Sequence, residues 1–204
     1  MTTIVPKERP ILFSAPMIRA LLAGTKTQTR REAKHPLARS ATRILSYHGQ
    51  SEFDCIQSDE TGGIILCPYG QPGQRLWVRE TLYFDKCGEE WCYVAGNDPV
   101  MADPYTAPIL LTEGRKFVPS IHMPREASRL LLEITAVRCE RLQDISEADA
   151  KAEGVKAFVP VPGDGPSMTA KQMYARLWES INGPGSWALN PWVWVVSFRL
   201  ITPA

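Results

Sequence analysis

Ser128 to Arg141 reads SRLLLEITAVRCER and is the clearest strand in the chain, because aliphatic and β-branched residues favour strands. The chain closes with a second apolar stretch, PWVWVVSFRLI from Pro191 to Ile201, which is typical of a strand buried on both faces. A third strand is predicted in GQRLWVRET, which begins at the end of the turn residues Gln71 to Gly73. Strands therefore dominate the predicted fold.

Three helices are predicted between these strands. The first runs from Ser14 to Gly24, the second from Asp144 to Gly154, and the third from Met168 to Asn182. Segments rich in Pro and Gly at about 35–70 and 84–120 predict two insertions, the second with a strand near Trp91 to Ala95. The connections vary too much for regular βαβ units. We therefore expect a single α+β domain over residues 1–204, a small, mostly antiparallel barrel or curled sheet with peripheral helices.

Composition excludes several classes of protein. The chain has 204 residues, 44% of them hydrophobic, and a formal net charge of +1, so no global field draws it to nucleic acid or membranes. No apolar run is long enough to span a bilayer. The first ten residues, MTTIVPKERP, lack the apolar core of a signal peptide. We expect a cytoplasmic, monomeric protein with no membrane partner.

The five cysteines do not indicate a disulfide framework or a metal site. Their number is odd, and the predicted compartment keeps thiols reduced. Cys87 and Cys92 are the closest pair, but no second Cys or His pair with zinc-ligand spacing follows them. We expect ordinary thiols, and neither a metal nor another cofactor.

The stretch GTKTQTRR, from Gly24 to Arg31, has no apolar side chain and follows directly after a predicted apolar helix. It is either a solvated edge strand or the wall of a site. Lys26 could act as a base if burial or the neighbouring arginines lower its pKa, and Thr29 could then attack or orient a water. From these residues alone the edge strand is the favoured interpretation.

Two further groups could carry chemistry. Glu153 lies in the last turn of a predicted helix, where the macrodipole disfavours a carboxylate slightly, although a solvated glutamate is the simpler interpretation. The second group combines arginine forks with an aromatic ring, which suit phosphate and nucleobases if they converge. Its candidates for binding substrate or nucleic acid are Arg30, Arg31, Trp77, Arg79, Glu80, His122, Arg125 and Arg129. Taken singly, Trp77 favours a core position and His122 a hydrogen-bonded structural one.

The chain contains no G-x-S-x-G elbow, P-loop, dinucleotide fingerprint or HExxH motif. It does resemble the ASCH domain proteins of phages and prophages. The resemblance rests on four stretches and is weakest at 35–65 and 84–116. The stretches are ILFSAPMIRALLAGTKTQTRR, PGQRLWVRET, PSIHMPREASRLLLEITAVRCERLQDISEADAKAEG and LWESINGPGSWALNPWVWVVSFRL.

The resemblance implies a PUA-like barrel and a nucleoside or RNA partner. Some ASCH proteins are amidohydrolases that remove an acetyl group from the exocyclic amine of acetylated cytidine, using a Lys, a Thr three residues later and a Glu. Lys26, Thr29 and Glu153 match these positions. Other members resemble RNA-binding modules or are linked to RNA cleavage, so both remain alternatives.

The catalytic interpretation makes a geometric prediction. In a regular strand Lys26 and Thr29 face opposite ways, because their separation is odd. We therefore expect an irregular turn or bulge from Gly24 to Thr27, with a regular strand only near Thr29.

Overall fold

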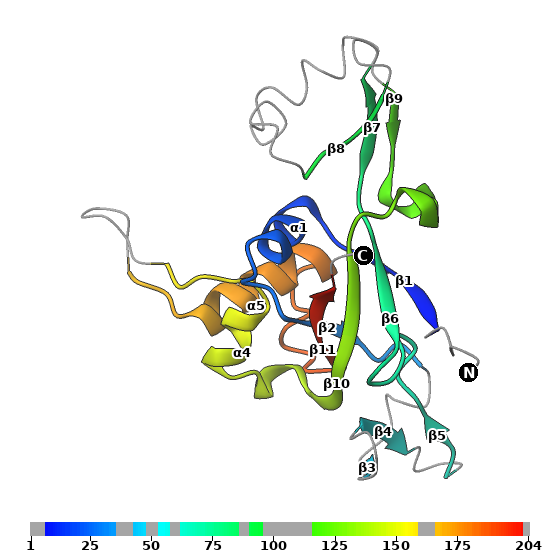
Figure 1. The fold of residues 1–204 in the computed structure, drawn as a ribbon. Helices are drawn as coiled ribbons and strands as arrows, with labels where there is room; N and C mark the ends of the chain where they lie inside the picture. The colour runs from blue at the N-terminus through cyan, green and yellow to red at the C-terminus, as the bar shows by residue number, and fades with distance from the viewer. Residues whose placement is uncertain are drawn as a thin grey trace, which may run out of the picture. The chain divides into compact units, whose positions relative to one another are not determined.

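A computed structural model describes residues 7–35, 43–47, 53–57, 62–85, 90–95, 116–158 and 166–201 of the chain. These residues form a mixed α+β fold in which most strand pairs are antiparallel (Figure 1). They pack as two compact units. Residues 1–24, 75–132 and 200–204 belong to the first unit, and residues 25–74 and 133–199 to the second. The sequence predicts a closed barrel, but none is found among the described strands.

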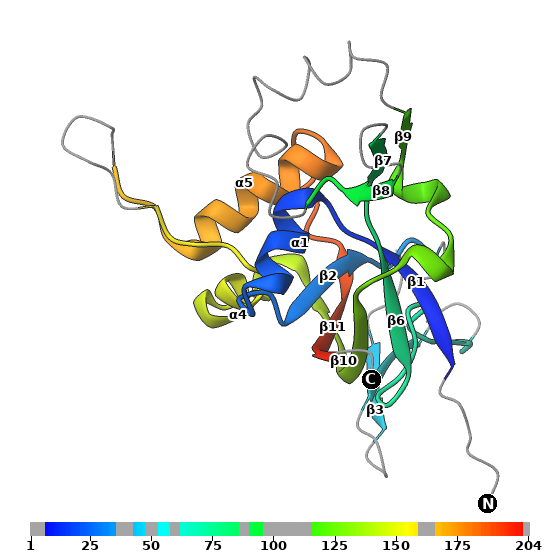
Figure 2. The same ribbon diagram turned by 45° about the horizontal axis from the view of Figure 1, so that its top comes forward.

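The second unit contains strands in the order β10 (Leu131–Arg141), β11 (Trp192–Ile201) and β2 (Gln28–Glu32), with β10 and β11 beginning or ending in the first unit. Figure 2 shows β2 beside β11, to which it is antiparallel, with Arg30 opposite Val195. The consecutive residues from Val193 to Val196 are all buried. β11 is therefore covered on both faces, which confirms the prediction from its sequence.

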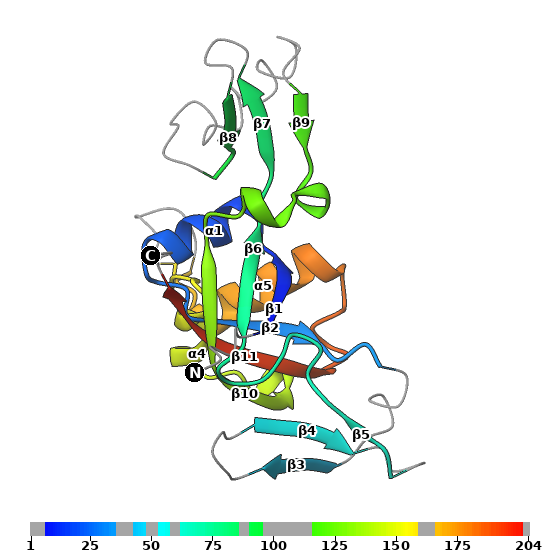
Figure 3. The ribbon, with the colours of Figure 1, turned by 45° about the vertical axis from the view of Figure 1, so that its right-hand side comes forward.

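The described part of the predicted insertion at 35–70 contains three short strands. β3 (Arg43–Tyr47) and β4 (Phe53–Gln57) form an antiparallel pair, which Figure 3 shows, and β5 (Ile64–Ile65) lies on the other side of β4. β4 is also parallel to β10, with Phe53 opposite Val137. The insertion thus extends the sheet of the second unit.

Both predicted helices of this unit are confirmed, and both carry their own capping residues. The Ser146 hydroxyl accepts the Asp149 N–H at the start of α4 (Glu147–Ala152). Thr169 and Gln172 form a capping box at the start of α5 (Ala170–Asn182). Apolar residues from both helices, from the 3₁₀ turn η4 (Leu142–Asp144) and from β11 make one core. They include Leu142, Ile145, Ala150, Tyr174, Trp178, Val193 and Val195.

The first unit begins with β1 (Glu8–Leu12), which is parallel to β6 (Arg75–Arg79), and continues into α1 (Ala15–Leu22). On β6, Leu76 and Val78 are buried and the alternate side chains are half-buried. The predicted insertion at 84–120 holds part of a separate antiparallel sheet. Its order is β8 (Glu90–Tyr93), β7 (Leu82–Asp85) and β9 (Lys116–Val118). Two 3₁₀ turns follow, η2 (Ser120–His122) and η3 (Arg125–Ala127).

The segment between α1 and β2 has an irregular backbone. Gly24 has φ +69, a left-handed conformation that glycine adopts without steric cost. Lys26 forms a single isolated bridge, and the regular strand begins only at Gln28. The predicted irregularity from Gly24 to Thr27 is therefore confirmed.

Candidate functional site

Lys26 and Glu153 meet in the second unit, although 127 residues separate them in sequence. The Lys26 Nζ lies 2.8 Å from Glu153 Oε2 and donates further hydrogen bonds to the backbone oxygens of Glu153 and Gln28, at 3.0 and 2.9 Å. The exposed fraction of the side chain is 0% for Lys26 and 4% for Glu153. The pair is thus a buried ion pair with fixed geometry. Within GTKTQTRR, Lys26, Gln28, Thr29 and Arg30 are buried, whereas Gly24, Thr25 and Thr27 are exposed.

Local backbone contacts bring the two residues together. Glu153 caps the C-terminus of α4, and Gly154 follows with φ +88, which ends the helix. The Thr27 N–H donates to the Ala152 carbonyl at 2.8 Å, and the Thr27 carbonyl accepts the N–H of Phe198. The end of α4 and the start of β2 are therefore held side by side.

The second oxygen of Glu153 accepts from Arg30. Arg30 Nη1 lies 3.3 Å from Glu153 Oε1, and its Nε and Nη2 donate to Glu140 Oε1 at 3.0 and 2.7 Å. Its Nη2 also lies 3.4 Å from Asp149 Oδ2. The Arg30 side chain has no exposed surface. Arg30, which the sequence suggests for substrate binding, thus lies inside a cluster of three carboxylates.

Two more side chains complete this charged cluster. Gln28 Nε2 donates to Asp149 Oδ1 at 3.0 Å, and Arg138 donates to Glu140 and Asp149 at 3.0 and 2.9 Å. The charges balance, with three cations against three carboxylates. The members of the cluster are Lys26, Arg30, Arg138, Glu140, Asp149 and Glu153.

Burial is the largest influence on the pKa of the Lys26 amine. Burial lowers the pKa of its amine below the usual 10.5, and the charges of Arg31 and Arg30 lower it further, although Glu153 acts in the opposite direction. Burial also lowers the pKa of Arg30, but Glu140 and Glu153 outweigh it, so that the pKa is raised. Arg30 is thus a permanent cation, whereas Lys26 can lose its proton more easily than an exposed lysine.

Thr29 is not brought to this cluster by its side chain. It is buried in the regular part of β2, between Gln28 and Arg30, whose side chains both reach the cluster. Side chains alternate along a strand, so Thr29 faces the other side of the sheet. Arg31, two residues on, shares that face. The structure joins Lys26 to Glu153 in a salt bridge, whereas alternation alone predicts the face on which Thr29 lies.

The first unit gathers most of the other predicted binding residues. The guanidinium of Arg79 lies 5.0 Å from the centre of the Trp77 ring, and that of Arg125 lies 6.0 Å from it. Arg79 donates to the carbonyl of Met123, and Arg125 pairs with Glu8 at 2.8 Å. Arg79 and Arg125 therefore converge on the ring of Trp77, the third predicted residue.

Glu80, Arg129 and His122 have different surroundings. Glu80 is buried and accepts two hydrogen bonds from Arg129, both at 2.9 Å. Arg129 also lies 4.1 Å from the centre of the Tyr93 ring. His122 lies exposed on η2. Glu80 thus holds Arg129 in place, whereas the imidazole of His122 faces solvent.

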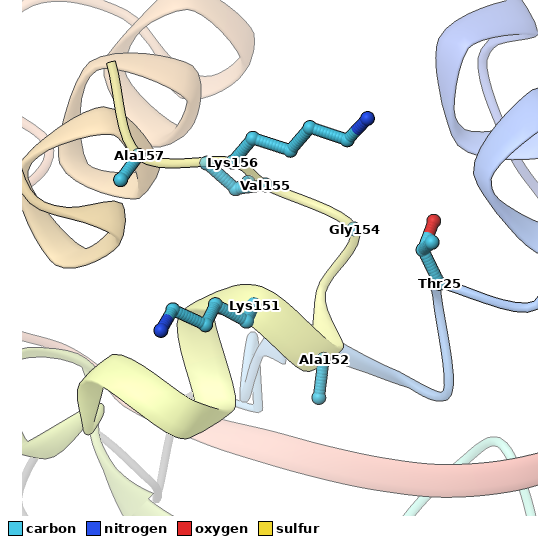
Figure 4. Close-up of a pocket in the computed structure, with 7 residues that line it drawn as sticks. All are labelled: Thr25, Lys151, Ala152, Gly154, Val155, Lys156 and Ala157. Carbon is cyan, nitrogen blue, oxygen red and sulfur yellow. The ribbon is translucent and has the colours of Figure 1, made fainter. Parts of the chain in front are cut away.

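A cavity of about 450 Å³ lies next to the bridge between Lys26 and Glu153 (Figure 4). Chain neighbours of both residues line it, but the two residues themselves do not. The lining residues are Thr25, Lys151, Ala152, Gly154, Val155, Lys156 and Ala157. The charged cluster and the cavity are therefore two separate features of the same unit.

Among the described residues, no group of three or more His, Cys, Asp or Glu side chains is arranged to hold a metal ion. Cys87 lies outside the described residues, so its predicted state stays a prediction. Cys92 is a free thiol. None of the described helices has the length and apolar character needed to cross a membrane.

Asp149 predicts how stability responds to acid. Partial burial raises its pKa, but hydrogen bonds from Gln28 and Ser146, with Arg138 and Arg30, lower it to about 2 from 3.8. The pKa of Asp149 is lower in the folded state than in the unfolded state, so its ionised carboxylate stabilises the fold above pH 3.8. This contribution to stability is lost as the pH falls toward 2. Asp149→Asn should lower the free energy of unfolding by about 1–2 kcal/mol at pH 7, allowing for solvent screening.

Denaturant unfolding at pH 7 and at pH 2.5 checks this prediction. The difference between wild type and Asp149→Asn should shrink at the lower pH. Asp144→Asn is the matched control, because Asp144 is exposed. An equal loss in both variants would contradict the role given to Asp149.

Sequence analysis missed Gln28, Arg138, Glu140 and Asp149 as members of the cluster. One signal for Gln28 was present in the sequence. Lys26, Gln28 and Arg30 are two residues apart, so a strand would place their side chains on one polar face. The carboxylates opposite them come from β10 and α4.

Comparison of the chain with protein-family models, curated proteins and solved structures gave no match.

Proposed function

We propose that the chain is a nucleoside- or RNA-directed protein of the ASCH type, with a PUA-like barrel as its underlying fold. Its proposed activity is that of an amidohydrolase, which removes an acyl group from the exocyclic amine of a modified cytidine. One observation supports this most. Lys26 and Glu153, which match the ASCH positions, form a buried pair at 2.8 Å in which the pKa of the lysine is lowered.

The proposed chemistry uses Lys26 as the base in its neutral amine form, which keeps two of the three hydrogen bonds that the ammonium donates. It takes a proton from the attacking oxygen as that oxygen bonds to the acyl carbon. The tetrahedral intermediate then collapses, the bond between the acyl carbon and the exocyclic nitrogen breaks, and the Lys26 ammonium returns its proton to the leaving amine. The products are the free cytosine amine and a carboxylic acid. Glu153 orients Lys26 throughout.

Water is the attacking group that this arrangement favours. Gln28 and Arg30 both reach the cluster, and alternation along β2 predicts the Thr29 hydroxyl on the opposite face. The substrate reaches the pair only if the wall over Glu153 opens, because both side chains are buried.

Hydrolysis of acetylcytidine by the purified protein tests the proposal. Activity should be lost in Lys26→Ala and in Glu153→Ala, each first shown to be folded by circular dichroism. Thr29→Ala distinguishes the two nucleophiles, since activity should persist if water attacks and disappear if Thr29 does. Full activity in both the Lys26 and the Glu153 variants would eliminate the assignment.

A second candidate function, binding of RNA without turnover, is favoured by the surface around Trp77. Trp77 has Arg79 and Arg125 within 6.0 Å of its ring, and Arg125 is 40% exposed. Arginine guanidinium groups bind phosphate, and unpaired bases stack on aromatic and guanidinium planes. This surface belongs to the first unit and is independent of Lys26.

If this surface binds RNA, affinity for a single-stranded oligonucleotide should fall steeply with salt, because binding releases counterions. Arg125→Ala should weaken binding about tenfold and reduce the salt slope by about one. Fluorescence anisotropy at several salt concentrations measures both quantities. Arg199→Ala is the control, because Arg199 is 66% exposed and pairs with Glu133 at the surface. Salt-insensitive binding would contradict the RNA-binding surface.

A further inference from the structure

The Glu153 carboxylate lies between two buried cations, one at each of its oxygens. Oε2 accepts from Lys26 at 2.8 Å, and Oε1 accepts from Arg30 Nη1 at 3.3 Å. The side chains of both cations have no exposed surface, and that of Glu153 is 4% exposed. Glu153 therefore has a second counter-ion in place if either cation loses its charge.

Of these two cations, Lys26 is the one that can lose its proton. An arginine side chain stays protonated in proteins. Burial lowers the pKa of Arg30, but Glu140 and Glu153 raise it overall. For Lys26 the balance is the opposite, because burial lowers its pKa and outweighs the raising effect of Glu153, with Arg31 and Arg30 lowering it further.

The hydrogen bonds of Lys26 indicate which contact a neutral amine gives up. Its Nζ donates to the backbone oxygens of Gln28 and Glu153 at 2.9 and 3.0 Å, and to Glu153 Oε2 at 2.8 Å. A neutral amine has two N–H groups, which is enough for the two backbone oxygens. Glu153 Oε2 then loses its cation, and a buried carboxylate without a counter-ion is costly.

The other groups around Arg30 fix its position. Glu140, on β10, accepts from its Nε and Nη2 at 3.0 and 2.7 Å, and Asp149, on α4, lies 3.4 Å from its Nη2. Glu140 and Asp149 are 17% and 26% exposed, so water screens part of their charge. The ring of Tyr174, on α5, lies 6.0 Å from the guanidinium, and burial raises the pKa of its phenol, which therefore stays neutral.

We propose that Arg30 is a positioning residue, the permanent counter-ion that lets Lys26 become a neutral amine without leaving the buried Glu153 carboxylate unpaired. The use of this amine as a base rests on the proposed function, whereas the pairing rests on the contacts alone. Arg30 acts through Glu153 and does not touch the reacting atoms.

Titration of the Lys26 side chain by NMR tests this inference without any substrate. The signal of Lys26 is assigned by its absence in Lys26→Met. Arg30→Gln should raise the pKa of Lys26 and so lower its neutral fraction at pH 7 about tenfold, because Glu153 then depends on Lys26 for its charge balance. Arg30→Lys keeps the charge and should restore most of the neutral fraction. An unchanged or lowered pKa in Arg30→Gln would overturn the inference, and so would a pKa in Arg30→Lys as high as that in Arg30→Gln.

Arg138→Gln provides the matched control. It removes one positive charge from the same cluster, but Arg138 pairs with Glu140 and Asp149 and is 36% exposed. The pKa of Lys26 should rise clearly less than in Arg30→Gln, and an equal rise would contradict the special place of Arg30. If Arg30→Gln does not fold, Glu140→Gln takes its place. It leaves the charge of Arg30 less neutralised, so the pKa of Lys26 should fall, and a rise would overturn the inference.

The pH dependence of acetylcytidine hydrolysis separates this inference from the proposed function. In Arg30→Gln the rate profile should move to higher pH together with the pKa of Lys26, whereas a merely structural loss would lower the rate equally at every pH. A raised pKa without hydrolysis in any variant would leave the role of Arg30 standing and remove the proposed function. Hydrolysis by the wild-type protein with an unchanged pKa in Arg30→Gln would do the reverse.

Discussion

Glu153→Gln is expected to lower the free energy of unfolding at pH 7 by about 3–5 kcal/mol, the cost of removing one partner from a buried ion pair. The Glu153 carboxylate lies between two buried cations, Lys26 at 2.8 Å and Arg30 at 3.3 Å. Glutamine has nearly the same volume, so the loss reports charge and not packing. Urea unfolding measures it, and an unchanged slope shows that the folded state stays compact.

Lys26→Met gives the matched comparison for this prediction. Methionine keeps an unbranched apolar stem, and Glu153 retains Arg30 as a partner. The loss should therefore be smaller than in Glu153→Gln, about 1–3 kcal/mol. The double variant should cost less than the sum of the two single variants, because the groups are in contact. Strict additivity would contradict the coupling that the 2.8 Å contact implies.

The deficit of Glu153→Gln should also shrink as the pH rises from 7 toward 10. Glu153 is the group that raises the pKa of Lys26, and without it burial lowers that pKa further. A lysine whose folded pKa lies below the unfolded value of about 10.5 binds fewer protons when folded, so stability rises with pH up to the unfolded pKa. The difference from wild type isolates this titration from other lysines. A deficit independent of pH would contradict it.

The sequence predicted the backbone around Lys26 better than the surroundings of its side chains. The catalytic interpretation, which requires Lys26 and Thr29 to converge despite their odd separation, predicted an irregular segment before β2, and this is what the structure has. Arg30 was expected to face substrate, yet its partners Glu140 and Asp149 lie more than a hundred residues further along the chain. The alternation of side chains along a strand predicts which face of the sheet a residue lies on. Which residues cover that face depends on contacts between segments distant in sequence.

The same distinction explains the fold. α4 was predicted from the capping spacing of Ser146 and Asp149, and α5 from an apolar stripe that ends at Gly183. Both signals are local in the sequence. β1 was not predicted, because it is short, contains Pro10 and depends on a parallel partner, β6, far along the chain. A closed barrel requires particular pairings of strands that no local pattern specifies. Element types could thus be predicted, whereas closure could not.

Lys26→Ala is expected to lower kcat/KM for acetylcytidine hydrolysis by about 10²–10⁴-fold, the usual contribution of a positioned base. The rate of the wild-type protein should rise with pH and level off at an apparent pKa below 10.5, because burial lowers the pKa of this amine.

Lys26→Arg separates the two chemical roles, since arginine keeps the positive charge but does not lose its proton. If Lys26 is the base, Lys26→Arg should be as inactive as Lys26→Ala. If Lys26 instead stabilises an oxyanion as a cation, Lys26→Arg should retain activity and the wild-type rate should fall with rising pH, with Glu153 then acting as the base. Measured from pH 6 to 10 with circular dichroism to confirm folding, the two profiles have opposite slopes, so the experiment overturns one role or the other.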